Sequence, residues 1–211
     1  MPTRGVGTDL LAKNAGRLTP RDLDRLVLGE LLPFVDRVVV LPVAAVVASD
    51  IAELYDTNLG VDLVAAPTVV GTAGSSGFGV IHHAALRLGP KTVAATELRR
   101  QAHARHTFDF DAFTTDVMVL DLARGRSEDF LDECLPYVAE FGLMLRQALH
   151  LIAGPDRTVL PERWDCVPTR SVVDRPGLIH WADPVKPWAD EYTAERERWL
   201  ELADAVEQRR T

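Results

Sequence analysis

The sequence predicts an α/β fold, in which helices cover a layered sheet, and three observations support this. Short apolar runs rich in β-branched residues, typical of buried strands, occur at 37–41, 61–66 and 117–120. Segments with helical spacing of apolar residues or with helix-start signals lie between and around these runs. The chain has 211 residues, of which 47% are hydrophobic, and this is enough to bury one core. In such folds ligands bind at the carboxyl ends of the strands.

The elements expected first along the chain follow from local signals. The polar, glycine-containing residues 1–18 are expected to be irregular. A helix begins at Thr19–Pro20, because threonine is a good N-cap and proline suits the first helical position. The strand at 37–41 ends or bends at Pro42, which cannot donate a ladder hydrogen bond. The other elements expected here are a capped helical turn at 49–54 and a second strand at 61–66.

The rest of the chain begins with a glycine-rich loop at 71–79, which has neither Walker nor dinucleotide spacing and is a connector or a lid. Ser127 is expected to cap a helix that Pro136 and Gly142 divide in two, ending near 153–155. The other elements are a helix at 91–105, strands at 117–120, 159–167 and 176–181, and a final amphipathic helix at 193–208 that buries Trp199, Leu202, Ala203 and Val206.

Composition excludes several function classes. The net charge is −8 and no run of Lys or Arg occurs, so binding to nucleic acid or to an anionic membrane is not expected. The longest apolar stretch, Val38–Ala48, contains Pro42 and is too short to span a bilayer. No signal peptide is recognisable, and Cys134 and Cys166 lie far apart without metal-ligand spacing. These features predict a reduced, cytoplasmic protein.

The segment Leu178–Trp188 carries the strongest functional signal. An apolar run ends in His180, and two prolines then stiffen a loop that presents Asp183 and Lys186 between two tryptophans. This set suits a phosphorylated ligand, with lysine binding phosphate and histidine or aspartate binding a bridging cation. The alternative is a strand end with packed tryptophans and an exposed lysine.

The same segment resembles the C-terminal signature of glycosyltransferase family 8, His-aromatic-Ala/Gly-x-Pro-x-Lys-Pro-Trp. Three further landmarks resemble the family in the correct order, at 36–54, 117–122 and 160–165. The resemblance implies a nucleotide-diphospho-sugar transferase (GT-A) fold, a mixed sheet flanked by helices and missing its first strands. The implied domain spans 19–190, and 191–211 forms a C-terminal helix.

The resemblance also implies roles for individual residues. His180 matches the family's metal ligand and Lys186 its diphosphate ligand. Asp183 stands where the family usually has glycine, and we expect it beside His180 as a second metal ligand. Asp116 lies on the expected acceptor side, where it positions an acceptor hydroxyl or caps a turn. Arg146 is a further catalytic candidate, because it brings a cation close to the expected site.

Three motifs depart from the family pattern. Pro42–Val43–Ala44 replaces the Asp-x-Asp that holds manganese, and its side chains contain no oxygen. Phe113–Asp116 replaces Phe-Asn-Ser-Gly, and Leu145–Gln147 replaces Asp-Gln-Asp, with His150 at an asparagine position. The Mn²⁺ that the resemblance implies therefore lacks its usual ligands. The expectation is a metal-free mechanism in which Lys186, helped by Arg146 or Arg105, carries the positive charge.

A second candidate cation site lies at 103–111. His103 and His106 would share a helix face, and Asp109 and Asp111 follow directly. The alternative, which we favour, is a solvated helix end followed by a polar loop.

The leading functional hypothesis is retaining transfer of a sugar from a UDP-sugar to an unknown acceptor. The alternative is a non-catalytic relative that serves as a binding or scaffold subunit. A serine or cysteine hydrolase is disfavoured because no activated nucleophile is recognisable. By resemblance the family has a nucleoside-binding half-sheet before the central strand, and roughly the first third of the family's length is expected to be absent from this chain. We therefore expect a shortened relative, a start site placed too far downstream, or a partner chain, which makes a homo-oligomer plausible.

Overall fold

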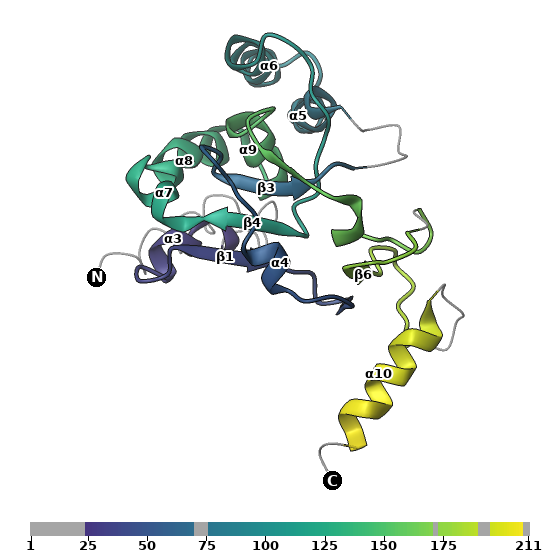
Figure 1. The fold of residues 1–211 in the computed structure, drawn as a ribbon. Coiled ribbons are helices and arrows are strands. Elements are labelled where there is room, and N and C mark those ends of the chain that lie inside the picture. Colours follow the sequence, from purple (N-terminus) through teal and green to yellow (C-terminus); the bar gives the residue numbers. More distant parts are fainter. Residues whose placement is uncertain (1–23, 70–75, 171–172, 190–194, 209–211) are drawn as a thin grey trace.

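The computed structural model describes residues 24–69, 76–170, 173–189 and 195–208. Figure 1 shows the predicted α/β arrangement, a sheet of mixed direction with helices against it. The expected irregular segment 1–18 and the helix start at Thr19–Pro20 lie outside the described residues. The strands are β1 (Arg37–Val40), β2 (Ala45–Val47), β3 (Val64–Pro67), β4 (Met118–Asp121), β5 (Thr158–Leu160) and β6 (Leu178–His180). The helices are α3 (Leu28–Leu31), α4 (Ala52–Tyr55), α5 (Gly77–Arg87), α6 (Val93–Arg105), α7 (Leu122–Ser127), α8 (Phe130–Phe141), α9 (Leu145–Ile152) and α10 (Arg196–Gln208), with a 3-10 turn η1 (Glu162–Trp164).

The main sheet has the order β1-β4-β3-β5, and its strand directions decide where a site can form. β4 is antiparallel to both of its neighbours, whereas β3 and β5 are parallel. The carboxyl ends of β1, β3 and β5 and the amino end of β4 therefore lie at one edge of the sheet. Three segments meet there: 67–69 after β3, 114–116 before β4, and 161–165 after β5.

A smaller sheet pairs β2 with β6 and adds His180 to this edge. Ala45 lies opposite His180 in the antiparallel register. Backbone bonds tie β6 to the segment after β5, since Cys166 N–H donates to Leu178 O at 3.1 Å and His180 N–H donates to Cys166 O at 2.9 Å. β6 and the chain next to Cys166 are thus held side by side.

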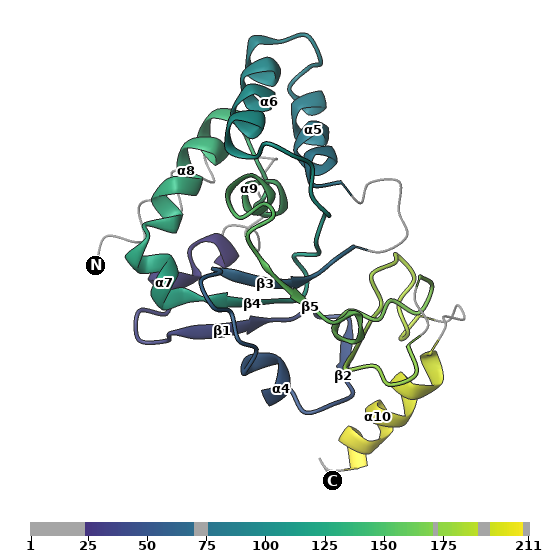
Figure 2. The same cartoon turned by 45° about the horizontal axis from the view of Figure 1, so that its top comes forward.

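Two apolar clusters stabilise the sheet, one on each face. Val64, Met118 and Leu149 belong to the larger cluster, beneath α8 and α9, and Leu54, Trp164 and Leu178 belong to the smaller one. Figure 2 shows α5 and α6 as a pair that extends the helical layer beyond α9. Each fully buried large aliphatic side chain stabilises the fold by about 1.5–3 kcal/mol relative to exposure.

Helix α5 was not predicted, because the glycines from 71 to 79 indicated a loop. The helix begins at Gly77, and its N-cap is Ser76, whose Oγ accepts a hydrogen bond from Gly79 N–H at 2.8 Å. A Cβ on Gly77 would stand 2.1 Å from the Phe110 ring. Glycine here therefore permits close packing rather than a flexible connection. Residues 71–75 of the expected loop are outside the described part of the chain.

Other element boundaries also differ from the prediction. Ser127 ends α7 instead of capping a helix, and Pro136 lies inside α8 without dividing it. Pro136 lacks the backbone N–H that would donate to the carbonyl oxygen of Asp132. Asp132 and Pro136 are both exposed, so water can bond to that carbonyl instead. Gly142 does separate α8 from α9, with a φ of 61°. The strand expected at 159–167 ends at Leu160, because Pro161 follows and η1 begins.

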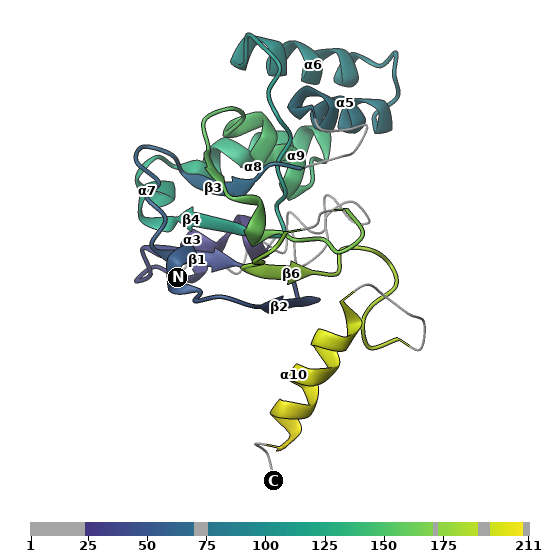
Figure 3. The same cartoon turned by 45° about the vertical axis from the view of Figure 1, so that its right-hand side comes forward.

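The C-terminal helix α10 does not bury its apolar residues, in contrast to the prediction. Leu202 is 42% exposed and Val206 52% exposed. In Figures 1, 2 and 3 the helix projects away from the sheet. Its contacts are at its base, where Arg196 Nε donates to Pro187 O at 2.9 Å and the Trp199 ring lies 6.0 Å from that of Trp188. The apolar face of α10 therefore packs against no apolar core among the described residues.

Candidate active site

A cavity of about 240 Å³ opens at the carboxyl edge of the main sheet. Its walls come from the segments that the strand directions bring together, with the first turn of α9 opposite β6. The polar residues that matter for its chemistry are Thr68, Thr115, Asp116, Arg146, Asp165 and His180. Three residues singled out from the sequence, Asp116, Arg146 and His180, thus line one cavity although they are far apart along the chain.

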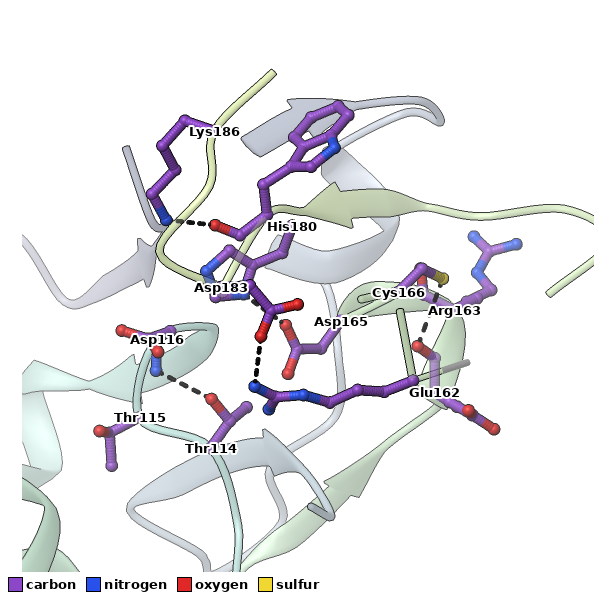
Figure 4. Close-up of polar contacts among 12 residues, drawn as sticks. Thr114, Thr115, Asp116, Glu162, Arg163, Asp165, Cys166, His180, Asp183 and Lys186 are labelled. Atoms are coloured by element: carbon purple, nitrogen blue, oxygen red, sulfur yellow. Dashed lines mark hydrogen bonds and ion pairs between the residues drawn. The ribbon is translucent and has the colours of Figure 1, made fainter. Parts of the chain in front are cut away.

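His180 is paired with a carboxylate that the sequence analysis did not assign to it. Its Nδ1 lies 2.9 Å from Oδ1 of Asp165. Figure 4 shows the two side chains next to each other. The His180 residue is 5% exposed and the Asp165 side chain 16% exposed. Because a carboxylate only accepts hydrogen bonds, Nδ1 carries the hydrogen in this contact. The pairing fixes the orientation of the imidazole at the cavity wall.

Asp183, expected beside His180, has other partners. Its carboxylate accepts a hydrogen bond from Thr169 Oγ1 and forms an ion pair with Arg170 at 2.9 Å. The bond from Thr169, together with Arg170, lowers the pKa of Asp183. Lys186 donates from Nζ to the carbonyl oxygen of Trp181 at 2.5 Å, and it is not among the residues that line the cavity. The two charged side chains of the loop after His180 are therefore both engaged, Lys186 with the backbone of its own loop and Asp183 with Thr169 and Arg170.

Asp116 and Arg146 line the cavity from the segment before β4 and from α9. The Asp116 side chain is 47% exposed and has Arg25 Nη1 at 3.9 Å, and Arg25 also donates to Thr115 O at 3.1 Å. Partial burial lowers the pKa of Arg146, and the negative charge of Asp116 opposes this shift. The Arg146 guanidinium makes no hydrogen bond or ion pair with any residue that the structure describes.

His150, which the sequence showed only as a departure from asparagine, connects the helix that carries Arg146 with the segment that carries Asp116. Its Nδ1 donates to Arg146 O at 2.6 Å, and its Nε2 accepts from Phe113 N–H at 3.1 Å. The ring also stacks on Phe113, with centroids 3.9 Å apart. Burial lowers the pKa of His150 to about 3, so the ring is neutral at ordinary pH. The helix that carries Arg146 is thereby fixed to the segment that carries Asp116.

The residues present do not fit a hard divalent cation. Pro42–Val43–Ala44 offers no side-chain oxygen, and both oxygens of Asp183 are engaged. Over the described ranges, no group of three or more His, Cys, Asp or Glu side chains is arranged to hold a metal. At the second candidate site, His106 Nε2 bonds to Leu151 O, and Asp109 accepts from the backbone of Phe78. These two side chains serve the fold.

Other functional expectations are changed by the tertiary structure. Arg105, considered as a cation for the site, pairs with Glu133 and lines a separate cavity. Conversely, Asp165 and Arg170 both line the site cavity but were not predicted as site residues from the sequence. A signal for Asp165 existed, because it is the last residue of the landmark at 160–165 that resembles the family. No local signal marked Arg170.

Comparisons with known proteins agree on the fold. A family model described as "Glycosyl transferase family 8" matches residues 10–192. The apo structure of the WbbM bifunctional glycosyltransferase matches with a TM-score of 0.61 at 20% identity, covering 84% of this chain and 34% of WbbM. The galactosyltransferase LgtC, solved with donor and acceptor sugar analogues, gives 0.59 at 20% identity and covers 86% of this chain and 65% of LgtC.

A third solved structure extends the likeness to an animal protein. Mouse xyloside xylosyltransferase 1 in its apo form gives a TM-score of 0.53 at 14% identity, covering 84% of this chain and 72% of that chain. This chain therefore spans about one third of WbbM and about two thirds of LgtC. No curated protein sequence matches it. Within the described residues, every helix is too short or too polar to cross a membrane.

Proposed function

This chain belongs to glycosyltransferase family 8, and from that premise we propose that it transfers a sugar from a UDP-sugar to an acceptor hydroxyl with retention of configuration. The observation that carries the proposal is the convergence of His180, Arg146 and Asp116 on one polar cavity at the carboxyl edge of the sheet. This edge is where α/β folds bind ligands.

The nucleotide diphosphate leaves with negative charge, so the site must supply positive charge or hydrogen-bond donors. His180 stands at the cavity wall with its ring oriented by Asp165. Lys186 lies one loop away and is bonded to Trp181 O. On donor binding, the Lys186 ammonium exchanges that carbonyl for a phosphate oxygen. A lysine is suited to this exchange because its stem is flexible and its ammonium is a point charge.

No step in this proposal passes through a divalent cation, because the donor set does not fit one. Positively charged side chains neutralise the leaving diphosphate instead. Asp116 also lines the cavity, and its half-exposed carboxylate accepts a hydrogen bond from the acceptor hydroxyl.

Thermal unfolding with and without UDP or GDP tests the proposal. A nucleotide at about one hundred times its dissociation constant stabilises by about 2.7 kcal/mol. For a chain of this size the melting temperature rises by about 5–10 °C. We expect this rise with UDP, and its loss in Lys186→Ala and His180→Ala.

Matched controls separate the site from general effects of charge. Lys91→Ala and His83→Ala make the same changes at exposed positions that do not line the cavity. Both should keep the rise with UDP. Absence of a rise with either nucleotide, or a full rise in both site variants, would contradict the proposal.

A further inference from the structure

Arg146 is a cavity cation whose guanidinium has no partner among the described residues. Other arginines at or near the cavity are engaged: Arg170 with Asp183 at 2.9 Å, and Arg157 with Thr68 Oγ1 at 2.8 Å. The Arg146 side chain has no such contact, although it lines the cavity. Its donors are therefore open to a ligand.

In the first turn of α9, Arg146 is the residue whose side chain lines the cavity, while its two neighbours are held elsewhere. Leu145 is 4% exposed and belongs to the apolar core. Gln147 uses its Oε1 to accept from Met144 N–H at 2.8 Å and from Arg87 at 3.3 Å, and so caps α9. Arg146 projects from between these two anchored residues. The backbone that carries it is held by the bond from His150 to its carbonyl.

The negative groups around the cavity leave Arg146 available for an anion. Asp165 is paired with His180, and Asp116 has Arg25 beside it. Glu162 comes from η1, on the wall formed by the chain after β5, whereas Arg146 comes from α9. Asp116 interacts with Arg146 only through its charge, without a hydrogen bond.

The chemistry of an open guanidinium selects the ligand. Its planar fork of N–H donors matches a carboxylate or a phosphate through two parallel hydrogen bonds, and in the proposed function Lys186 is the residue that binds the phosphate. In the family pattern stated above, this position carries glutamine, whose neutral amide suits hydroxyl groups of a neutral sugar. We infer that Arg146 binds the carboxylate of an acidic sugar, so that the substrate is a uronic acid. This inference deepens the proposed function and rests on it for the identity of the site.

The acidic sugar can be the donor's own sugar or part of the acceptor, and titration calorimetry distinguishes these sources. The full chain is titrated with UDP, UDP-glucose and UDP-glucuronate, and then with free glucuronate or glucose in the presence and absence of UDP. A charge-assisted pair predicts that the glucuronate form binds at least about tenfold more tightly than the glucose form in one of these arms. Tighter binding of UDP-glucuronate than of UDP-glucose identifies the acidic sugar as the donor's sugar. Tighter binding of free glucuronate than of free glucose identifies it as part of the acceptor.

Arg146→Gln restores the family's residue and should bring the affinities for the glucuronate form and the glucose form together. Arg100→Gln, on exposed α6, is the matched control and should keep the preference. Equal binding of glucuronate and glucose forms in every arm overturns the inference, as does a loss of UDP affinity in Arg146→Gln, which would place Arg146 on the diphosphate.

The outcomes for the two proposals are separable. Failure of UDP to bind counts against the proposed function alone, because free glucuronate and glucose in the absence of UDP still report on Arg146. A preference for glucuronate that Arg146→Gln abolishes supports the inference even then.

Discussion

His180 Nδ1 and Asp165 Oδ1 meet at 2.9 Å, although fifteen residues separate them in sequence. The contact exists because the backbone of Cys166 bonds to β6 on both sides of Ile179. The carboxylate expected beside His180 was Asp183, which is turned toward Thr169 and Arg170 instead. The orientation of the family's signature histidine in this chain therefore depends on a different acid.

Removal of the Asp165 carboxylate should destabilise the fold. Asp165→Ala leaves His180 Nδ1 without an acceptor in a buried position, which costs about 1–3 kcal/mol. Asp165→Asn keeps an acceptor oxygen of nearly the same shape, and we expect a clearly smaller loss. Urea unfolding of both variants measures this difference. Asp174→Ala, at an exposed position, is the control. Equal losses in the alanine and asparagine variants would mean that the hydrogen bond contributes nothing.

Binding of UDP should not depend on manganese. The side chains at Pro42–Val43–Ala44 cannot ligate it, and Asp183 is already engaged. The rise in melting temperature with UDP should be the same in millimolar Mn²⁺ and in excess EDTA. A rise seen only with manganese would show that other ligands assemble when the nucleotide binds.

His150 should make the fold sensitive to mild acid. Its pKa is lowered to about 3 in the folded chain from the ordinary value of 6.5, so the unfolded chain takes up a proton first as the pH falls. The stability that the neutral ring contributes is therefore complete above pH 6.5 and is lost progressively down to about pH 3. The limiting slope is about 1.4 kcal/mol per pH unit for one proton.

Urea unfolding at several pH values between neutrality and about 5, above the range of most carboxylates, measures this contribution. His150→Asn should be less stable at neutral pH, because the stack on Phe113 is lost, but its stability should change less with pH. His83→Asn, at an exposed position, should keep the wild-type slope. A wild-type slope in His150→Asn would assign the acid sensitivity to another group.

Both thiols should be inert in the folded protein. Burial raises the pKa of Cys134 well above its ordinary value and that of Cys166 to about 11, and the thiolate is the reactive form. A colorimetric thiol reagent should modify neither residue at neutral pH within minutes, and should modify both after unfolding in guanidinium. Rapid modification of one thiol in the folded state would indicate that its surroundings open readily.

Local signals in the sequence determined the strands β1 and β4 and the helix α6, and structure and prediction agree there to within one or two residues. These elements are defined by runs of β-branched residues or by a Thr92 cap, which act over a few neighbouring residues. α5 was missed because glycine occurs both in flexible turns and where another side chain approaches the backbone closely. At Gly77 the second reason applies, because the ring of Phe110 packs against it. α10 was assigned a buried face because amphipathicity records which face is apolar, not whether a core lies beside it.

The candidate site also divides into features that the sequence determined and features that only the tertiary structure decided. The sequence by itself determined the family, the departures at Pro42–Ala44 and 145–147, and the residue types that carry charge. Only the tertiary structure decided that Asp116, Arg146 and His180 share a cavity, that Lys186 bonds to Trp181 O, and that Asp183 bonds to Thr169 and Arg170. The reason is physical: short-range sequence controls backbone conformation and the face a residue occupies. Contacts between distant segments depend on strand direction and register, which are set by the packing of the whole sheet.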